Sequence, residues 1–369
     1  MTPVHGTCHE RFAGVRAAFA DLFASHGEVG AAAAVHLDGE PVVDLWGGHT
    51  DAARTTPWAR DTLVCVWSTS KTVTNLCALV LADRGEIDLD APVSRYWPEF
   101  AAAGKGGVEV RHLLAHTAGL PDWDTPLHVT DLYDWDKATT LLARQAPRWE
   151  PGTASGYHVT TQGHLVGEVI RRVTGRTVGD FLAAEVSGPL GADFAMSLPA
   201  SQDHRVADCI PPSQSAPPTA AVPPVLVRRL VEPEDTWTPE WRRAEIPAVG
   251  GFGNARSVAT ILSALAGADT ALLSEAGRGH VFRRQSRGTD LVLGVPITFG
   301  IGYALVDPHW PLSPNPRTCF WGGRGGSLAV VDTDARLVVT YTMNRMTTAG
   351  LRDPRGLSLV EAAYRALAA

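Results

Sequence analysis

A serine and a lysine lie one helical turn apart in the segment Ser68-Thr69-Ser70-Lys71. At this spacing both side chains lie on the same side of a helix, so the lysine amine can reach the serine hydroxyl. A serine hydroxyl is a weak nucleophile, and a buried lysine can take its proton once the charged form of the amine is disfavoured. Free N–H groups at the start of the helix favour developing negative charge at the same place. The spacing therefore predicts nucleophilic catalysis, and an N-cap serine with a surface lysine is the competing interpretation.

The element that carries this motif is predicted to be a buried helix. The apolar segment 63–67 precedes it, and Gly85 is placed to end it. Between them apolar residues recur at helical spacing, at Val73, Leu76, Cys77, Val80 and Leu81. An apolar stripe of this width is typical of a helix between two layers of structure.

The remaining patterns predict an α/β fold with one sheet assembled from both ends of the chain. Strands are expected at 31–37 and 41–46, joined by an Asp38-Gly39 turn, and at 298–305, 328–331 and 337–343. Other helices are expected at 8–25, 160–174, 256–265 and 357–367. We expect a single unit with an α/β part at about 1–85 and 260–369 and an α-rich part of helices and loops at about 86–259.

Within the α-rich part, the segment 211–239 contains eight prolines. Proline removes a backbone donor and fixes φ, so such a dense run excludes regular structure. The segment predicts a long surface loop or lid.

Composition excludes several classes of protein. The chain has 369 residues, 45% hydrophobic and 19% charged, with 32 basic and 39 acidic side chains and a net charge of −7. This is globular composition without a basic stripe, so no nucleic-acid partner is expected. No run approaches the roughly 20 apolar residues of a membrane span. Glu10, Arg11 and Arg16 stand where a signal peptide needs an apolar run, which predicts a cytoplasmic protein with no membrane partner.

Five cysteines occur without a C-x-x-C pair, at Cys8, Cys65, Cys77, Cys209 and Cys319. Their odd number and spacing argue against a disulfide scaffold and a zinc knuckle, and they fit a reducing compartment.

Longer segments resemble the serine β-lactamase and penicillin-binding-protein superfamily, in its class C-like branch, closest to the family VIII carboxylesterases. The resemblance covers about residues 10–365. Beyond Ser68 and Lys71, it rests on segments 44–48, 86–93, 111–120 and 253–257. It implies a β-lactamase-like fold, in which an antiparallel sheet is flanked by terminal helices and carries an α-rich insertion.

Tyr157, just before the helix expected at 160–174, matches the second motif of this family. The resemblance implies that Tyr157 exchanges protons with Ser68 and the leaving group. A phenol needs a nearby cation to lose its proton near neutrality, and Lys71 would supply that cation. Val159 stands where β-lactamases have an asparagine that contacts the lactam side-chain amide, which points away from efficient antibiotic hydrolysis. Taken alone, Tyr157 also fits a loop tyrosine that caps the helix.

The third motif of the family is matched by Trp321-Gly322-Gly323, which resembles the esterase variant and is expected on an edge strand lining the site. It lacks the cation that a β-lactamase places against the substrate carboxylate, while its glycines permit close approach to the backbone. The resemblance implies an oxyanion hole made of the backbone N–H groups of Ser68 and Arg324. Taken alone, the glycines fit a flexible turn.

Other aromatic and histidine residues are weaker candidates. His158 adjoins Tyr157 and is either a substrate contact or an exposed loop histidine. Trp123 and Trp237 lie in polar or Pro-rich loops and are candidates to line a substrate pocket, as are Trp135 and Trp310. His112 and His116 are four residues apart but lack the glutamate of H-E-x-x-H, so no metal site is expected.

These features together favour a serine hydrolase that cleaves small-molecule carboxylic esters through an acyl-enzyme on Ser68, with Lys71 and Tyr157 as proton-transfer groups. The chemistry requires no cofactor. One alternative is an acyltransferase of a natural-product pathway, which forms the same intermediate on the same fold. Others are a β-lactamase or D,D-peptidase and a non-catalytic binding protein, although retention of Ser68, Lys71 and Tyr157 argues against the last.

Overall fold

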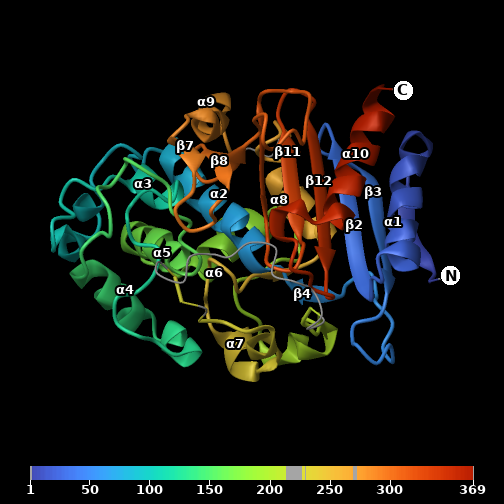
Figure 1. The fold of residues 1–369 in the computed structure, drawn as a ribbon, viewed down its shortest axis with the longest axis horizontal. Coiled ribbons are helices and arrows are strands. Elements are labelled where there is room, and N and C mark those ends of the chain that lie inside the picture. The colour runs from blue at the N-terminus through green and yellow to red at the C-terminus, as the bar shows by residue number, and fades with distance from the viewer. Residues whose placement is uncertain (1, 213–226, 229, 269–271, 369) are drawn as a thin grey trace.

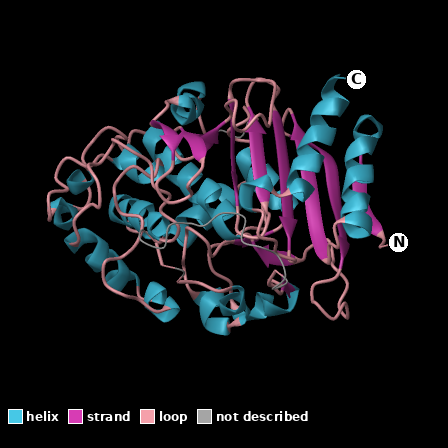
Figure 2. Cartoon of the chain, viewed as in Figure 1, coloured by secondary structure: helices cyan, strands magenta, loops and turns pink. Residues whose placement is uncertain are grey.

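The computed structural model describes residues 2–212, 227–228, 230–268 and 272–368, and its main feature is a nine-stranded antiparallel sheet (Figures 1 and 2). The strand order is β1-β3-β2-β12-β11-β10-β9-β8-β7. The bounds are β1 Val4–Cys8, β2 Gly30–Leu37, β3 Glu40–Gly48, β7 Ser286–Thr289, β8 Pro296–Phe299, β9 Ala304–Leu305, β10 Thr318–Gly322, β11 Leu328–Asp332 and β12 Leu337–Met343. The sheet thus combines the two ends of the chain, as expected.

A second sheet and the helices complete the described part of the chain. The small sheet has the order β5-β4-β6, with β4 Leu63–Cys65, β5 Val206–Ala207 and β6 Phe252–Gly253. The helices are α1 Ala13–Ser25, α2 Ser70–Asp83, α3 Val110–Leu114, α4 Trp135–Arg144, α5 Thr161–Thr174, α6 Val178–Leu182, α7 Pro239–Arg243, α8 Ala255–Leu262, α9 Glu275–Gly279 and α10 Pro354–Ala368. The region expected to hold only helices and loops therefore also contains β5 and β6.

Helices cover both faces of the large sheet. On β12, the Thr340 hydroxyl donates to the Ala255 carbonyl of α8, whereas the ring of the next residue, Tyr341, lies against Arg355 of α10. Since neighbouring strand residues point to opposite faces, α8 and α10 lie on opposite sides of the sheet. The two terminal helices α1 and α10 pack together (Figure 1). The predicted fold class, an antiparallel sheet with flanking terminal helices, is confirmed.

The hairpin β2–β3 and the helix α2 form as predicted. Asp38 and Gly39 have φ values of +54° and +85°, the positive values that a two-residue hairpin turn of type I′ requires. Gly85 has a φ of +74° just beyond the end of α2. Side chains of α2 are buried from Ser70 to Leu81, so this helix lies between layers of structure.

The N-terminal prediction was partly wrong, because the helix expected at 8–25 begins at Ala13. A 3₁₀ helix, Glu10–Phe12, precedes it, and Val4–Cys8 form β1, which pairs antiparallel with β3. A Cβ on Gly6 would lie 1.9 Å from the Asp44 carbonyl oxygen, so the close approach of β1 to β3 depends on glycine. A five-residue edge strand interrupted by glycine has too little alternation to be recognised from sequence.

Two further predictions need correction. The strand expected at 298–305 is two strands, β8 and β9, because the chain turns at Gly300 and at Gly302, which has a φ of +87°. In the Pro-rich segment, residues 213–226 and 229 lie outside the described residues. Its end is regular, since Pro233–Trp237 is a 3₁₀ helix and α7 begins at Pro239. Proline is tolerated in the first turn of a helix, where its missing N–H would have no partner.

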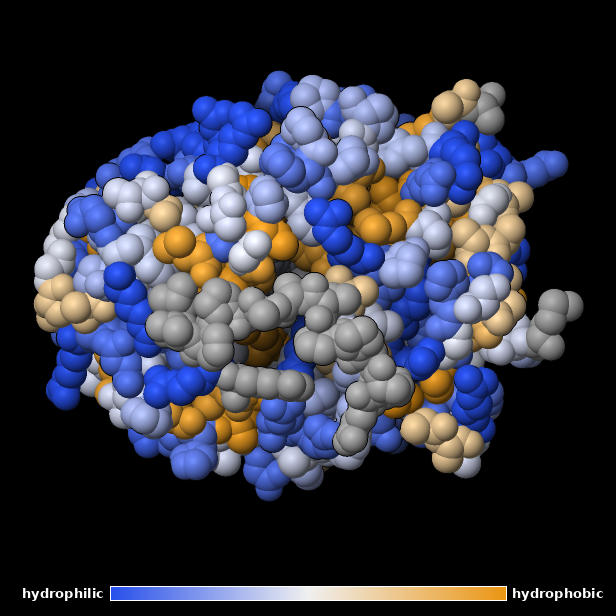
Figure 3. All heavy atoms as spheres, viewed as in Figure 1, coloured by the Kyte–Doolittle hydropathy of each residue, from blue (hydrophilic) through white to orange (hydrophobic). Residues whose placement is uncertain are grey.

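The face seen in Figure 3 is largely hydrophilic, and apolar residues gather near its middle, between the helical part and the sheet. None of the helices in the described part of the chain is long and apolar enough to cross a membrane.

Candidate active site

Ser68 lies in a 3₁₀ turn, Trp67–Thr69, which leads from β4 into α2. Ser70 closes this turn, because its Oγ donates to the Trp67 carbonyl at 2.5 Å and accepts from the Gly251 N–H at 2.9 Å. Trp67 has a φ of +52°, a backbone conformation that is costly for a residue with a side chain and is typical of functional sites. The fold therefore holds Ser68 in one conformation, with only 6% of its surface exposed.

Lys71 lies one turn further along α2, with its Nζ 3.3 Å from the Ser68 Oγ. The amine also donates to the carbonyls of Val159 at 2.7 Å and Ala248 at 2.9 Å. Burial lowers the pKa of Lys71 well below its ordinary value, because the interior disfavours the charged amine. A neutral amine has two N–H bonds, which the two carbonyls accept, and a lone pair that remains for the Ser68 hydroxyl. This geometry would allow Lys71 to take the proton of the Ser68 hydroxyl.

The Tyr157 hydroxyl is hydrogen-bonded to Ser68 and accepts from the Trp321 indole N–H at 3.1 Å. Burial raises the pKa of the phenol, and these two hydrogen bonds lower it in part. The expectation that Lys71 lowers this pKa as a cation was wrong. Its Nζ lies over the ring, 4.8 Å from the centroid, and burial disfavours its charge. The raised pKa therefore favours the protonated phenol.

An aromatic cluster surrounds the Tyr157 ring. His116, Phe299 and Trp321 lie with ring centroids between 4.7 and 6.2 Å from Tyr157 or from one another. Burial lowers the pKa of His116 well below its ordinary value, so this ring is neutral. The cluster surrounds Tyr157 with buried rings, and a low dielectric there strengthens the electrostatic interactions of its hydroxyl.

Asp290 fixes the backbone of Tyr157, a role that sequence analysis missed. Its Oδ1 accepts hydrogen bonds from the N–H groups of Tyr157 at 3.0 Å, Val292 at 2.9 Å and Leu293 at 2.9 Å. The side chain is fully buried. The signal that could have found it is an aspartate that begins a turn, since such residues bind N–H groups two and three residues ahead.

His158 is neither an exposed loop residue nor placed to contact a substrate, so both interpretations of it were wrong. The ring is fully buried, with Nε2 accepting from the Leu120 N–H at 3.0 Å. This leaves Nδ1 as the donor to the Gly156 carbonyl, 2.6 Å away. His158 therefore locks the loop that carries Tyr157, and its burial is not visible in the local sequence.

The third motif lies at the end of β10, directly beside the turn that carries Ser68. The expectation of an edge strand was wrong, because β10 lies between β11 and β9 in the sheet. β9 pairs only with Cys319 and Phe320 of β10, so Trp321 and Gly322 lie beyond that ladder. A Cβ on Gly323 would lie 2.4 Å from the Val66 carbonyl oxygen, so glycine is required for this close approach. Gly323 thus brings the chain that follows β10 close to the segment that carries Ser68.

The side chain of Arg324 points to neighbouring segments. Its Nη1 donates to the Val231 carbonyl at 2.6 Å, its Nη2 lies 3.2 Å from Glu232 Oε2, and the guanidinium lies 5.3 Å from the Trp67 ring centroid. These contacts hold the residue whose backbone N–H is the predicted oxyanion donor.

The tryptophans predicted to line a pocket lie in different places. Trp123 is fully buried in the core, and its indole donates to the Ala138 carbonyl of α4 at 2.9 Å. Trp135 donates to Glu168 and Trp310 to the Pro296 carbonyl, each at 2.7 Å. Trp237 has 42% of its surface exposed. We assign Trp123 to core packing, and a substrate contact of Trp237 remains a prediction.

His112 and His116 do not act together. His112 Nδ1 accepts from the Glu109 N–H at 3.2 Å in a capping box at the start of α3, and His116 Nδ1 accepts from the His158 N–H at 3.2 Å. Within the ranges that the structure describes, no group of three or more His, Cys, Asp or Glu side chains could hold a metal ion.

Comparisons with known proteins identify the family of this chain. A family model described as beta-lactamase matches residues 15–364. Esterase/beta-lactamase LipL of Mycobacterium tuberculosis (strain ATCC 25618 / H37Rv) is 34% identical over 370 residues, which cover 93% of this chain and 83% of LipL. A family VIII carboxylesterase structure has 42% identity and a TM-score of 0.93, and covers 99% of this chain and 100% of its own. A penicillin-binding protein homologue from Caulobacter crescentus has 38% identity, a TM-score of 0.93 and the same coverage.

Proposed function

This chain belongs to the beta-lactamase family, and we propose that it acts as a carboxylesterase through an acyl-enzyme on Ser68. It is a hydrolase of the esterase/β-lactamase fold, close to the family VIII carboxylesterases, which confirms the resemblance seen in the sequence. The observation that carries the proposal is the position of the Ser68 hydroxyl, in contact with the amine of Lys71 and the phenol of Tyr157.

In the acylation step, Ser68 Oγ attacks the ester carbonyl carbon while neutral Lys71 takes the hydroxyl proton. The carbonyl oxygen becomes an oxyanion, which the backbone N–H groups of Ser68 and Arg324 stabilise. The close approach of Gly323 to the turn of Ser68 supports this pairing of donors.

In the departure step, the C–O bond to the leaving group breaks and Tyr157 donates its proton to the departing alkoxide. The Trp321 N–H stabilises the resulting phenolate through the hydrogen bond to its oxygen. Lys71 returns the proton to Tyr157, and water then attacks the acyl-enzyme with Lys71 again as base. The C–O bond to Ser68 breaks, Lys71 gives the proton to Ser68 Oγ, and the carboxylic acid leaves.

Esters fit this site better than β-lactam antibiotics. At the position of the third motif, Trp321 offers a neutral N–H that is already bound to Tyr157, where a β-lactamase has a cation. The test compares p-nitrophenyl butyrate with the cephalosporin nitrocefin. We expect kcat/KM to be about 10³-fold higher for the ester, because the site lacks partners for the lactam carboxylate. Equal efficiency on both would instead indicate a β-lactamase, and turnover of neither would favour a binding protein.

Trp321→Phe is expected to slow the proton transfer from Tyr157 to the leaving group without slowing the transfer from Ser68 to Lys71. Phenylalanine keeps the ring packing but removes the donor to Tyr157, so a phenolate becomes harder to form. For ethyl butyrate, whose leaving alkoxide needs a proton, we expect kcat to fall about 10-fold. For p-nitrophenyl butyrate, whose leaving group departs as a stable anion, kcat should change less than about twofold. Steady-state kinetics with both esters decides this, and an equal loss on both would contradict the role of Tyr157 as leaving-group acid.

Transfer of the acyl group to an alcohol is a second candidate activity, favoured by the burial of the site. Ser68 and Tyr157 are only 6% and 5% exposed, and aromatic rings flank them. Such a site limits the access of water to the acyl-enzyme. Product analysis with added alcohols distinguishes the two, since transfer yields a new ester and hydrolysis yields only the acid.

A further inference from the structure

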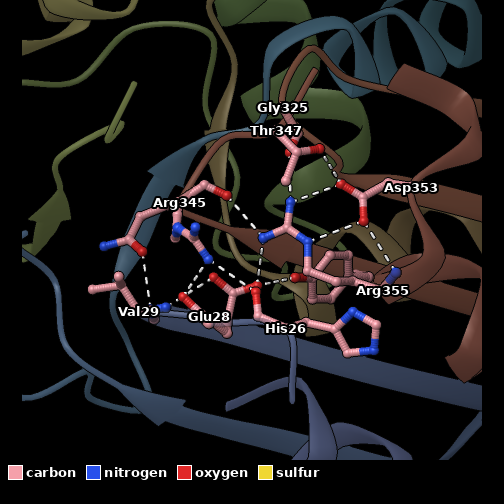
Figure 4. A network of polar contacts seen from close by, with 12 residues as sticks. His26, Glu28, Val29, Gly325, Arg345, Thr347, Asp353 and Arg355 are labelled. Carbon is pink, nitrogen blue, oxygen red and sulfur yellow. Dashed lines mark hydrogen bonds and ion pairs between the residues drawn. The ribbon is translucent and has the colours of Figure 1, made fainter. Parts of the chain in front are cut away.

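The turn 323–326, which carries the candidate oxyanion donor Arg324, rests on a buried ion cluster (Figure 4). The turn is closed by the Gly326 N–H, which donates to the Gly323 carbonyl at 3.2 Å. Its Gly325 carbonyl accepts from Arg355 Nη2 at 2.7 Å and from the Thr347 N–H at 3.0 Å. This carbonyl is therefore bound from two directions.

Glycine is required where the turn meets the cluster. Gly326 has a φ of +127°, and a Cβ there would lie 2.5 Å from Asp353 Oδ2 and 2.6 Å from Arg355 Nη2. No other residue fits in this conformation at such a short distance. The backbone of the turn thus lies directly on the Asp353–Arg355 ion pair.

All five N–H groups of the Arg355 guanidinium have acceptors, although only 1% of the residue is exposed. The acceptors and distances are Asp353 Oδ1 at 3.0 Å, Asp353 Oδ2 at 2.8 Å, Glu28 Oε2 at 2.7 Å, the Arg345 carbonyl at 2.8 Å and the Gly325 carbonyl at 2.7 Å. These acceptors belong to four segments. Glu28 lies before β2, Arg345 follows β12, Asp353 directly precedes α10, and Gly325 lies in the turn 323–326.

The cluster is anchored independently of the turn. Glu28 is fully buried, and its carboxylate also accepts hydrogen bonds from the Tyr341 hydroxyl and the Val29 N–H. Removing one partner from a buried and fully bonded ion pair leaves an uncompensated charge, so such clusters resist rearrangement. Arg355 is consequently a rigid support for whatever it binds.

The other side of the turn contacts the nucleophile segment. Ser327, which follows the turn, donates from Oγ to the Val66 carbonyl at 2.9 Å and lies 3.0 Å from the Thr69 hydroxyl. The turn 323–326 is thus held between the segment that carries Ser68 and the guanidinium of Arg355.

From this arrangement we infer that Arg355 is a positioning residue for the oxyanion hole: by binding the Gly325 carbonyl it fixes the turn, so that the Arg324 N–H stays directed at the reacting carbonyl oxygen. The inference rests on the proposed function, because the hole matters only if Ser68 forms an acyl-enzyme. Arg355 acts through the turn and touches no reacting group.

The test compares Arg355→Lys with Tyr341→Phe. Lysine has three donors on a flexible stem and cannot reproduce the planar five-donor arrangement, so the Gly325 carbonyl loses its fixed partner. Tyr341→Phe disturbs the same cluster at Glu28, away from the turn, and serves as the control for stability. The measurements are the thermal midpoint of each variant, and kcat and KM for p-nitrophenyl butyrate, with each rate normalised to the nitrophenol burst.

Arg355→Lys is expected to lower kcat by about 10- to 100-fold with KM within about twofold, because the oxyanion forms only after binding. Tyr341→Phe is expected to keep kcat within about threefold of wild type at a comparable thermal midpoint. Asp353→Asn keeps the Arg355 guanidinium but weakens two of the hydrogen bonds that fix its orientation. We expect it to lower kcat by an intermediate amount. If Arg355→Lys does not fold, Asp353→Asn takes its place as the test variant.

The outcomes that would overturn the inference are distinct from failure of the proposed function. A wild-type burst that Ser68→Ala lacks establishes the acyl-enzyme on its own. If that burst is present and Arg355→Lys, or Asp353→Asn in its place, keeps wild-type kcat, only the positioning role is wrong. If Tyr341→Phe loses as much kcat as Arg355→Lys does, Arg355 has only a structural role and the positioning role is wrong. Absence of a wild-type burst removes the proposed function, and the inference with it.

Discussion

Ser68→Ala is expected to reduce ester turnover by about 10⁵-fold while leaving the fold intact, since loss of a serine nucleophile removes covalent catalysis altogether. The removed oxygen contacts Lys71 and Tyr157, whereas the backbone of the turn is held by Ser70 and Gly251. The measurement is the steady-state rate with p-nitrophenyl butyrate, together with the circular dichroism and thermal midpoint of the variant.

Ser70→Ala is the matched control, because it removes the same atom from the second serine of the same segment. Its hydroxyl is hydrogen-bonded to the Trp67 carbonyl, so we expect lower stability but retained burst kinetics. Wild-type turnover by Ser68→Ala, or loss of the burst in a folded Ser70→Ala alone, would show that the nucleophile is a residue other than Ser68.

Lys71→Met is expected to lower kcat/KM by about 10³-fold, because methionine fills a similar space but has no lone pair for the Ser68 proton. In the wild-type protein, activity should rise with pH through the pKa of Lys71, which burial lowers well below its ordinary value of 10.5. The resulting plateau should reach alkaline pH, since burial raises the pKa of Tyr157 and keeps the phenol protonated. A rate profile with its acid limb near 10 would show that Lys71 remains charged.

The same variant tests the protonation state through stability. The unfolded chain binds the Lys71 proton more tightly than the folded protein does, because the pKa is lowered only on folding. Between the lowered pKa and 10.5 the free energy of unfolding therefore rises with pH. Lys71→Met lacks this contribution, so the stability of wild type relative to the variant should increase with pH from the lowered pKa up to 10.5. Urea unfolding at several pH values measures this difference, and a constant difference would contradict a neutral Lys71.

The parts of the fold that local sequence determines could be predicted. The helical spacing after Ser68 and the turn at Asp38 and Gly39 depend on residues close together in the chain. β1 could not be predicted, because its five residues are defined by pairing with β3 rather than by their own pattern. The division of 298–305 into two strands could not be predicted either, because a glycine within a strand pattern, such as Gly302, fits both a bulge and a turn.

At the site, the residue types were predictable and their protonation states were not. The S-x-x-K spacing and the position of Tyr157 follow from sequence. The lowered pKa of Lys71 and the raised pKa of Tyr157, on which their proposed roles as base and acid depend, come from burial in the folded protein. Asp290 reaches Tyr157 across 133 positions of the chain, and Arg355 reaches Gly325 across 30. The turn that Asp290 begins has a local signature, but the contacts of Asp290 with Tyr157 and of Arg355 with Gly325 have none.

The most direct test of the account is the intact mass of the protein after rapid mixing with p-nitrophenyl butyrate and acid quenching. We predict that wild type gains the mass of one butyryl group, that peptide mapping places it on Ser68, and that Ser68→Ala gains none. Turnover by the wild-type protein without an adduct on Ser68, or an adduct on another side chain that Ser68→Ala retains, would contradict the acyl-enzyme mechanism.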